Sequence, residues 1–199
     1  MAIGVLEKLG LRTPVAAAAD PVREVVARAR HGDPAAFGDL FRRYVDGVHR
    51  HISLLMGPDS DIDDLVQLVF INVFQSMGSF KGRSAFSTWL FRITINVARQ
   101  EIRTRTRLRR LSAAFHEAEH ARARHHEASQ ERRLASWQEI YAILDRLPVK
   151  KRETYILYTY EGYSLDEIAW MLGSSISTIG SRLQSARREI LRILGERVG

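Results

Sequence analysis

Apolar residues recur at every third or fourth position over most of the chain, the spacing that gives an α-helix one buried face. No segment shows the alternating pattern that is typical of a half-buried strand. The pattern predicts helices over residues 20–32, 33–57, 59–77, 86–107, 134–147, 150–160 and 164–194. We therefore expect an all-α protein.

The helical pattern is interrupted once, by a stretch of Arg, Glu, His and Ala that has few large apolar residues. Such a composition favours a flexible linker over a packed element. The chain is therefore predicted to form two small helical domains joined by a flexible linker. The predicted boundaries are an N-terminal extension over 1–19, a first domain over 20–107, the linker over 108–133 and a second domain over 134–199.

The last predicted segment has the pattern of a helix-turn-helix. Ser164 and Glu167 have the spacing of a capping box at the start of a short helix. Gly173 permits a tight turn, and Ser174 or Ser175 can cap the helix that follows. Every basic residue in that second helix is Arg, whose planar fork binds phosphate or guanine through two hydrogen bonds. Small hydroxyl side chains at its start allow close approach to DNA, so we expect this helix to enter a major groove.

Composition and the absence of certain motifs exclude several classes of function. The 199-residue chain has a net charge of +7, which suits a polyanionic partner, and no Cys, which excludes disulfides and thiolate metal sites. Its apolar runs are too short to insert into a membrane, and its first residues are a poor export signal, so we expect a cytoplasmic protein. There is no phosphate-binding glycine loop and no nucleophile elbow, so we expect no enzyme activity, no cofactor and no small-molecule substrate.

Histidines in the linker offer one alternative site. His116 and His120 lie four residues apart with acidic neighbours, a spacing that can bind zinc on a helix. A solvated linker explains the same residues without a ligand, and we expect no bound metal.

Three stretches stand out in this order: DIDDLVQLVFINVF (61–74), FKGRSAFSTWLFRITINVARQEIR (80–103) and residues 147–187. Together they resemble the bacterial RNA polymerase sigma factors of the extracytoplasmic-function group, in the sigma-70 family. The first is similar to the region 2 helix that docks on core polymerase, and the second to the loop and helix that read and open the −10 promoter element. The third is similar to region 4, which reads the −35 element.

The resemblance assigns roles to particular residues. An acidic and polar face would bind core RNA polymerase: Asp61, Asp63, Asp64 and Gln67. The loop and the long helix would bind −10 promoter DNA: Lys81, Arg83, Ser84, Asn96, Arg99 and Arg103. The last helix would bind −35 DNA: Ser177, Thr178, Ser181, Arg182, Gln184, Arg187 and Arg188.

Three aromatic residues in the long helix have two interpretations. Phe86, Trp89 and Phe91 are candidate stacking platforms for bases, but their helical spacing favours core packing.

The chain departs from the family pattern at two positions. The family has an acidic residue after its Asp-Leu-Val-Gln motif, where this chain has Leu68. Gly180 stands where the family often has Lys in the last helix, which removes one expected phosphate contact.

The sequence is compatible with two functions. The resemblance implies an alternative sigma factor that promotes strand opening at promoters, together with an anti-sigma factor as a regulatory partner. The rival is a conventional dimeric helix-turn-helix regulator that reads paired half-sites without polymerase. In that rival the acidic helix and the −10-type helix would have no role.

Overall fold

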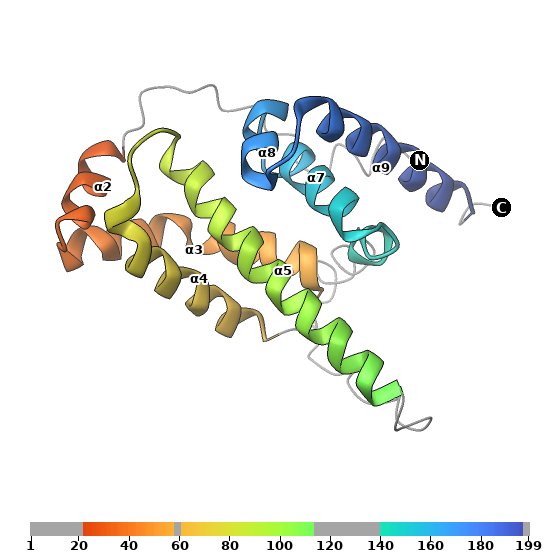
Figure 1. Ribbon diagram of the computed structural model, residues 1–199, viewed down its shortest axis with the longest axis horizontal. Helices are drawn as coiled ribbons and strands as arrows, with labels where there is room; N and C mark the ends of the chain where they lie inside the picture. The colour runs from red at the N-terminus through yellow and green to blue at the C-terminus, as the bar shows by residue number, and fades with distance from the viewer. Residues whose placement is uncertain (1–21, 58–60, 114–139, 197–199) are drawn as a thin grey trace, which may run out of the picture.

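The computed structural model describes residues 22–57, 61–113 and 140–196, and every regular element in these ranges is helical. In chain order these are α2 (Arg23–Arg30), α3 (Pro34–Met56), α4 (Ile62–Ser76), the short 3₁₀ helix η1 (Met77–Ser79), α5 (Phe86–Ala113), α7 (Val149–Thr159), α8 (Leu165–Leu172) and α9 (Ile176–Glu196) (Figure 1). Residues 140–144 form a further short helix before α7. The all-α prediction is confirmed.

The predicted helix ends are set by local hydrogen bonds and backbone geometry. Asp33 caps α3 by accepting from the amides of Ala35 and Ala36 at 2.9 and 3.2 Å. Ser164 caps α8 by accepting from the Glu167 amide at 3.3 Å, while the Glu167 carboxylate accepts from the Ser164 amide at 2.9 Å. This reciprocal pair is the capping box that the sequence predicted.

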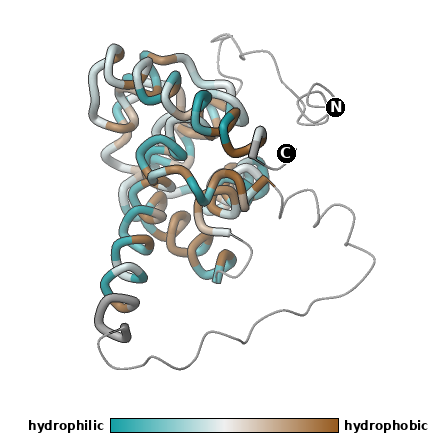
Figure 2. Tube along the Cα trace, turned by 90° about the vertical axis from the view of Figure 1, so that its right-hand side faces the viewer, coloured by the Kyte–Doolittle hydropathy of each residue, from teal (hydrophilic) through white to brown (hydrophobic). Residues whose placement is uncertain are grey.

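Helix α5 is longer than predicted, because it continues to Ala113, past the expected end at residue 107. Its first half is buried, with Phe86, Leu90 and Ile95 at most 1% exposed. Its second half projects from the helical bundle (Figure 1), and the projecting part is mostly hydrophilic (Figure 2). Residues 108–113 of the predicted linker are therefore helical.

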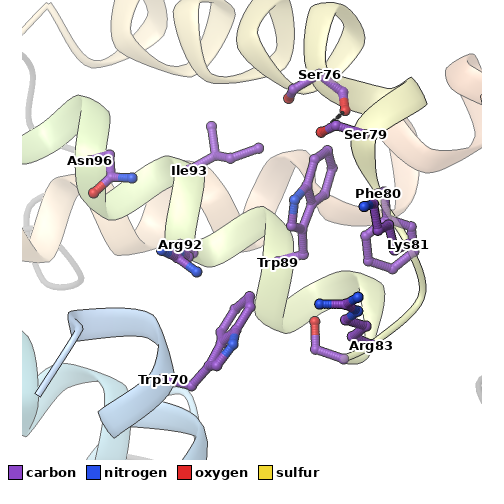
Figure 3. A pocket seen from close by; sticks show the side chains of 11 residues that line it. Ser76, Ser79, Phe80, Lys81, Arg83, Trp89, Arg92, Ile93, Asn96 and Trp170 are labelled. Atoms are coloured by element: carbon purple, nitrogen blue, oxygen red, sulfur yellow. Dashed lines mark hydrogen bonds between the residues drawn. The ribbon is translucent and has the colours of Figure 1, made fainter.

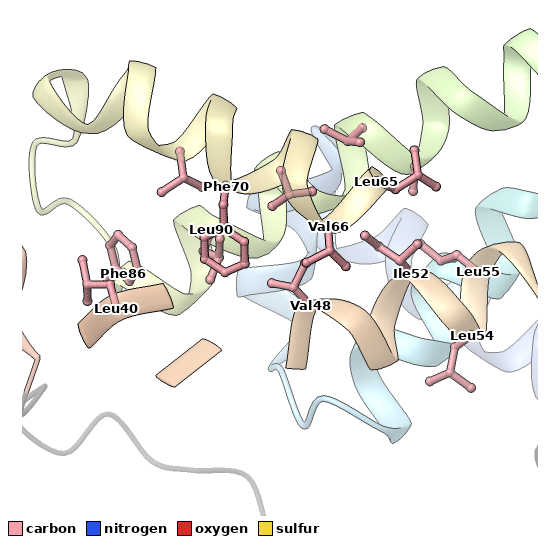
Figure 4. Packing of buried hydrophobic residues seen from close by; sticks show 14 of the residues in the cluster. Leu40, Val48, Ile52, Leu54, Leu55, Leu65, Val66, Phe70, Phe86 and Leu90 are labelled. Atoms are coloured by element: carbon pink, nitrogen blue, oxygen red, sulfur yellow. The ribbon is translucent and has the colours of Figure 1, made fainter. Parts of the chain in front are cut away.

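The first module (α2 to α5) has its core where α3, α4 and α5 meet. Leu40, Val48 and Ile52 of α3 are at most 1% exposed and pack with side chains of α4 and α5 (Figure 4). Burying each such side chain contributes about 1.5–3 kcal/mol. This core fixes the outward faces of α4 and α5, which carry the candidate sites.

The second module (residues 140–144 and α7 to α9) packs directly on the first, which the sequence did not predict. Phe91 and Ile95 of α5 share a buried cluster with Ile168 of α8 and Ile179 of α9. Buried residues before and within α7, such as Leu144 and Ile156, belong to the same cluster as the α3 core. The picture of two modules separated by a linker is therefore incomplete, because a contiguous interface joins them.

Candidate nucleic-acid interfaces

Helix α9 presents most of the predicted groove-contacting residues to solvent. Ser175 caps the helix by accepting from the Thr178 amide at 3.2 Å, so of the two serines considered it is Ser175 that serves as the cap. Six predicted contact residues are exposed: Ser177, Thr178, Ser181, Gln184, Arg187 and Arg188. Arg182 is half-buried and donates to the Ser174 hydroxyl at 3.2 Å.

Packing fixes one of these arginines in place. The guanidinium carbon of Arg187 lies 5.3 Å from the centre of the Tyr158 ring of α7, which is a cation–π contact. Ile176, an apolar residue in the first turn of α9, is 52% exposed. The exposed first turns of α9 are thus available to a duplex.

Helix α4 carries an acidic face continued by an apolar one. Asp61, Asp63, Asp64 and Gln67 are all exposed around its first two turns, as predicted. Beyond them Leu68, Ile71 and Phe74 are 43%, 50% and 61% exposed. We call these three residues the α4 apolar stripe. Sequence reasoning missed Ile71 and Phe74, since α4 is apolar nearly all round and periodicity alone could not assign its outer face.

A cavity of about 310 Å³ lies between the loop after η1, α5 and α8 (Figure 3). Its lining includes four of the six predicted −10 residues, namely Lys81, Arg83, Ser84 and Asn96. The remaining lining residues are Ser76, Ser79, Phe80, Trp89, Arg92, Ile93 and Trp170. We call this cavity the loop pocket. It combines cations, hydroxyls, an amide and aromatic rings, which is the chemistry that holds an unstacked base and its phosphate.

The three ambiguous aromatic residues divide between core and pocket. Phe86 and Phe91 are 1% and 5% exposed, so the core-packing interpretation is confirmed for both. Trp89 is half-buried, packs on Phe80 with ring centres 5.1 Å apart, and lines the loop pocket. Only Trp89 of the three is placed to contact a ligand there.

The other two predicted −10 residues lie outside the loop pocket. Arg99 donates from Nε and Nη2 to the two carboxylate oxygens of Glu153 on α7, at 2.7 and 2.6 Å. The side chain of Glu153 is fully buried and that of Arg99 is 23% exposed. The hydrogen bonds from Arg99 to this carboxylate raise the pKa of Arg99 above its ordinary value. Arg103 is exposed and donates to the Arg99 carbonyl at 3.3 Å.

Trp170 of α8 completes the loop pocket from the second module. Its ring is 41% exposed, and the guanidinium carbon of Arg92 lies 4.6 Å from the ring centre (Figure 3). Sequence reasoning missed Trp170 and Arg92, because nothing in the sequence shows that α8 packs against α5.

The described residues form neither a metal site nor a membrane-spanning helix. Within the described ranges no group of His, Cys, Asp and Glu side chains is arranged to hold a metal ion. His116 and His120 lie outside the described residues. None of the described helices is long and apolar enough to cross a membrane.

Comparison with known families yields two matches. The Sigma-70 region 2 model matches residues 40–108, and the Sigma-70 region 4 model matches residues 137–190. The first match contains α4 and most of the loop pocket, and the second contains α8 and most of α9.

Curated relatives match over most of their length. The RNA polymerase sigma factor NccH of Alcaligenes xylosoxydans xylosoxydans is 33% identical over 180 residues, covering 88% of this chain and 96% of the relative. The ECF RNA polymerase sigma factor SigM of Mycobacterium tuberculosis is 32% identical over 172 residues, covering 86% and 84%. The ECF RNA polymerase sigma-E factor of Escherichia coli is 31% identical over 176 residues, covering 83% and 90%.

Two solved structures share the fold. CnrH, in complex with the cytosolic domain of CnrY, aligns with a TM-score of 0.67 at 26% identity over 87% of this chain and 97% of that one. RpoE of Bartonella quintana, in complex with NepR, aligns with a TM-score of 0.64 at 24% identity over 80% and 96%.

Proposed function

The chain belongs to the extracytoplasmic-function group of the sigma-70 family of RNA polymerase sigma factors, and from this premise we propose which of its surfaces perform which step. It is an alternative sigma factor that works with core polymerase at promoters. The first module corresponds to region 2 and the second to region 4.

We propose that the loop pocket receives an unstacked base of the −10 element. The assignment is carried by one observation, namely that four of the predicted −10 residues line this pocket together. Lys81 and Arg83 are exposed on the loop, where they can neutralise phosphates, and Trp89 offers a ring for stacking. Extruding a base costs a few kcal/mol, which contacts inside a pocket can offset. Asn96 lines the same pocket and can read a base edge.

The −35 element is proposed to bind along α9. Ser177, Thr178 and Ser181 are small and exposed at its start, so the helix end can approach base edges closely. Arg187 and Arg188 lie further along the helix and are proposed to bind phosphates.

Core polymerase is proposed to bind α4 through Asp61, Asp63, Asp64 and Gln67. Exposed carboxylates steer a basic partner and fix its register. The α4 apolar stripe continues this face and adds area that a partner can bury.

The proposed polymerase contact of α4 is tested by reversing one of its charges. Asp64→Arg should abolish co-purification with core polymerase and run-off transcription, while leaving helix content unchanged. Asp39→Arg is the matched control, because Asp39 is an exposed carboxylate on α3, outside the proposed face. Full polymerase binding by the Asp64→Arg variant would refute the assignment. Tight binding of the chain alone to an inverted repeat would instead support the dimeric regulator.

The remaining roles follow from the family. We propose that this subunit supplies promoter choice and strand opening in the cytoplasm, and that the polymerase supplies the catalytic groups. We also propose an anti-sigma factor as a regulatory partner. The structure of CnrH with the cytosolic domain of CnrY, 26% identical to this chain, supports that proposal.

A further inference from the structure

The loop pocket has walls from both modules. Trp89, Arg92 and Asn96 come from α5, where spacings of three and four residues place them on one face of the helix. Trp170 of α8 points toward this face from the second module (Figure 3). The cavity volume of about 310 Å³ lies at the small end of the range for ligand sites, about 300–1,000 Å³. Its size therefore suits a small molecule.

Three cations at this pocket have no acidic partner. Lys81 and Arg83 on the loop and Arg92 on α5 are exposed, and among the described residues no carboxylate lies within ion-pair distance of them. Arg99, by contrast, is paired with Glu153. The lining of the pocket contains neither Asp nor Glu. Three positive charges without a carboxylate favour a ligand with several negative charges, and phosphate is the anion that Arg binds through parallel hydrogen bonds.

Aromatic rings add a flat apolar surface beside these cations. Trp89 is half-buried and Trp170 is 41% exposed, so each ring keeps accessible surface. The guanidinium carbon of Arg92 lies 4.6 Å from the centre of the Trp170 ring, a contact that holds this cation at the pocket wall. Rings of this kind bind nucleic-acid bases by stacking. Asn96 adds an amide, which can form two hydrogen bonds with the edge of adenine.

We propose that the loop pocket of the free chain binds a purine nucleoside triphosphate, with its base against Trp170 and its phosphates on the three cations. Such a ligand is an effector, neither a substrate nor a cofactor. The proposal rests on the function proposed for the loop pocket, since the nucleotide and the −10 strand share the loop cations Lys81 and Arg83. It goes beyond that function, because it adds a small-molecule ligand and a contact from the second module.

Isothermal titration of the full-length chain with ATP measures the affinity of this site. ATP should bind about tenfold more tightly than adenosine, which has the base alone, and than tripolyphosphate, which has the phosphates alone, because only ATP makes both kinds of contact. The absence of ATP binding would overturn the proposal. Equal affinities for ATP and tripolyphosphate would also overturn it, since the cations would then bind any polyanion.

The contribution of the second module is tested with Trp170→Ala. This change should weaken ATP binding by about tenfold through loss of stacking, whereas Trp170→Phe should retain most of the affinity. Tyr158→Ala is the matched control. Tyr158 is 37% exposed on the same module and lies 5.3 Å from the guanidinium carbon of Arg187, but it does not line the loop pocket. Equal ATP affinities of the Trp170→Ala and Tyr158→Ala chains would overturn the proposal.

Arg92→Gln tests the site without changing Trp170, in case that variant fails to fold. It should weaken ATP binding by about tenfold and make the affinity less sensitive to salt, because one screened charge contact is lost. Arg42→Gln is the control, since it removes the same charge from an exposed position on α3. Equal losses of affinity in these two variants would show that only net charge matters, and the proposal would fail.

Run-off transcription separates this proposal from the −10 role of the same pocket. Trp89→Ala should impair strand opening by the holoenzyme if the pocket receives a −10 base. Normal transcription by the Trp89→Ala holoenzyme, together with ATP binding that depends on Trp170, would refute the −10 role alone. Impaired transcription by that variant, together with no ATP binding by the wild-type chain, would refute the nucleotide site alone.

Discussion

Gly57 ends α3 with a φ of +89°, directly beneath the ring of Tyr141. A Cβ at this position would overlap the ring carbon Cζ of Tyr141, and the Tyr141 hydroxyl donates to the neighbouring Met56 carbonyl at 3.0 Å. Only glycine satisfies both the backbone angle and the contact.

Gly57→Ala should therefore lower the free energy of unfolding by about 1–3 kcal/mol, from backbone strain and displacement of Tyr141. Urea unfolding measures this loss. Gly78→Ala is the control, because no described atom lies within 4 Å of its added Cβ. Equal midpoints for the two variants would contradict the steric argument.

Gly180, unlike Gly57, can be replaced by a larger residue. A side chain there would meet open space, and the backbone φ is not positive. Gly180→Lys should restore the missing phosphate contact and steepen the salt dependence of duplex binding by about 0.9 in log–log slope. Gly180→Ala separates helix stabilisation, about 1 kcal/mol, from the charge. Titration with a random-sequence duplex at several salt concentrations measures both. Identical slopes for the Lys and Ala variants would place Gly180 away from DNA.

Helix α4 exposes the large apolar side chains of the α4 apolar stripe on its outer face. Ile71 is 50% exposed in the middle of the α4 apolar stripe. Ile71→Ser should weaken polymerase binding by about tenfold through lost apolar burial, yet change stability by less than about 0.5 kcal/mol. Leu108→Ser, at a 58% exposed position on α5, should leave polymerase binding unchanged. Competition against a labelled wild-type chain for core polymerase distinguishes the two variants.

Elements were predictable where the signal is local. Ser164, Glu167 and Gly173 define α8 from its own sequence, because caps and turns depend on neighbouring residues. The end of α5 was not predictable, since the segment that continues it, LRRLSA (108–113), runs into a stretch of Arg, Glu, His and Ala whose composition suits a helix or a linker equally. The outer face of α4 was also ambiguous, because the helix has apolar residues on nearly all of its sides.

The whole molecule depends on contacts that no local pattern reveals. Arg99 is predicted to contact DNA because it lies in a basic half-helix, and that local pattern does not reveal its carboxylate partner 54 residues away. Four of the six predicted −10 residues do meet in one pocket, because the loop and α5 are adjacent in sequence. Trp170 could not be assigned, since its role requires knowing how the modules pack.

Acid should weaken the packing of the two modules. Burial opposes ionisation of Glu161, but the His51 ring 3.5 Å away and the Arg50 guanidinium outweigh it and hold the pKa of Glu161 below its ordinary value. A depressed pKa stabilises the interface between the modules above the ordinary glutamate range, and this contribution disappears as pH falls through the lowered pKa. Energy transfer between dyes attached at Ala27→Cys on α2 and Leu191→Cys on α9, in a chain that has no native Cys, should therefore drop on acidification below about pH 4.5.

Glu161→Gln is the matched variant for the acid experiment. Its energy transfer should start lower and respond less to acid over the same interval, while far-UV circular dichroism follows the helices separately. An identical acid response in both chains would show that another group controls the transition.

The projecting half of α5 has a consequence for promoter geometry. At 1.5 Å per residue, its extension past residue 107 carries the start of the connection to the second module about 9 Å farther outward. Residues 114–139 have a contour length of roughly 90 Å when fully extended, comparable to about 25 base pairs of B-form duplex. This tether thus sets an upper bound on the spacer between the two promoter elements, and shortening it should narrow the range of spacers the holoenzyme tolerates.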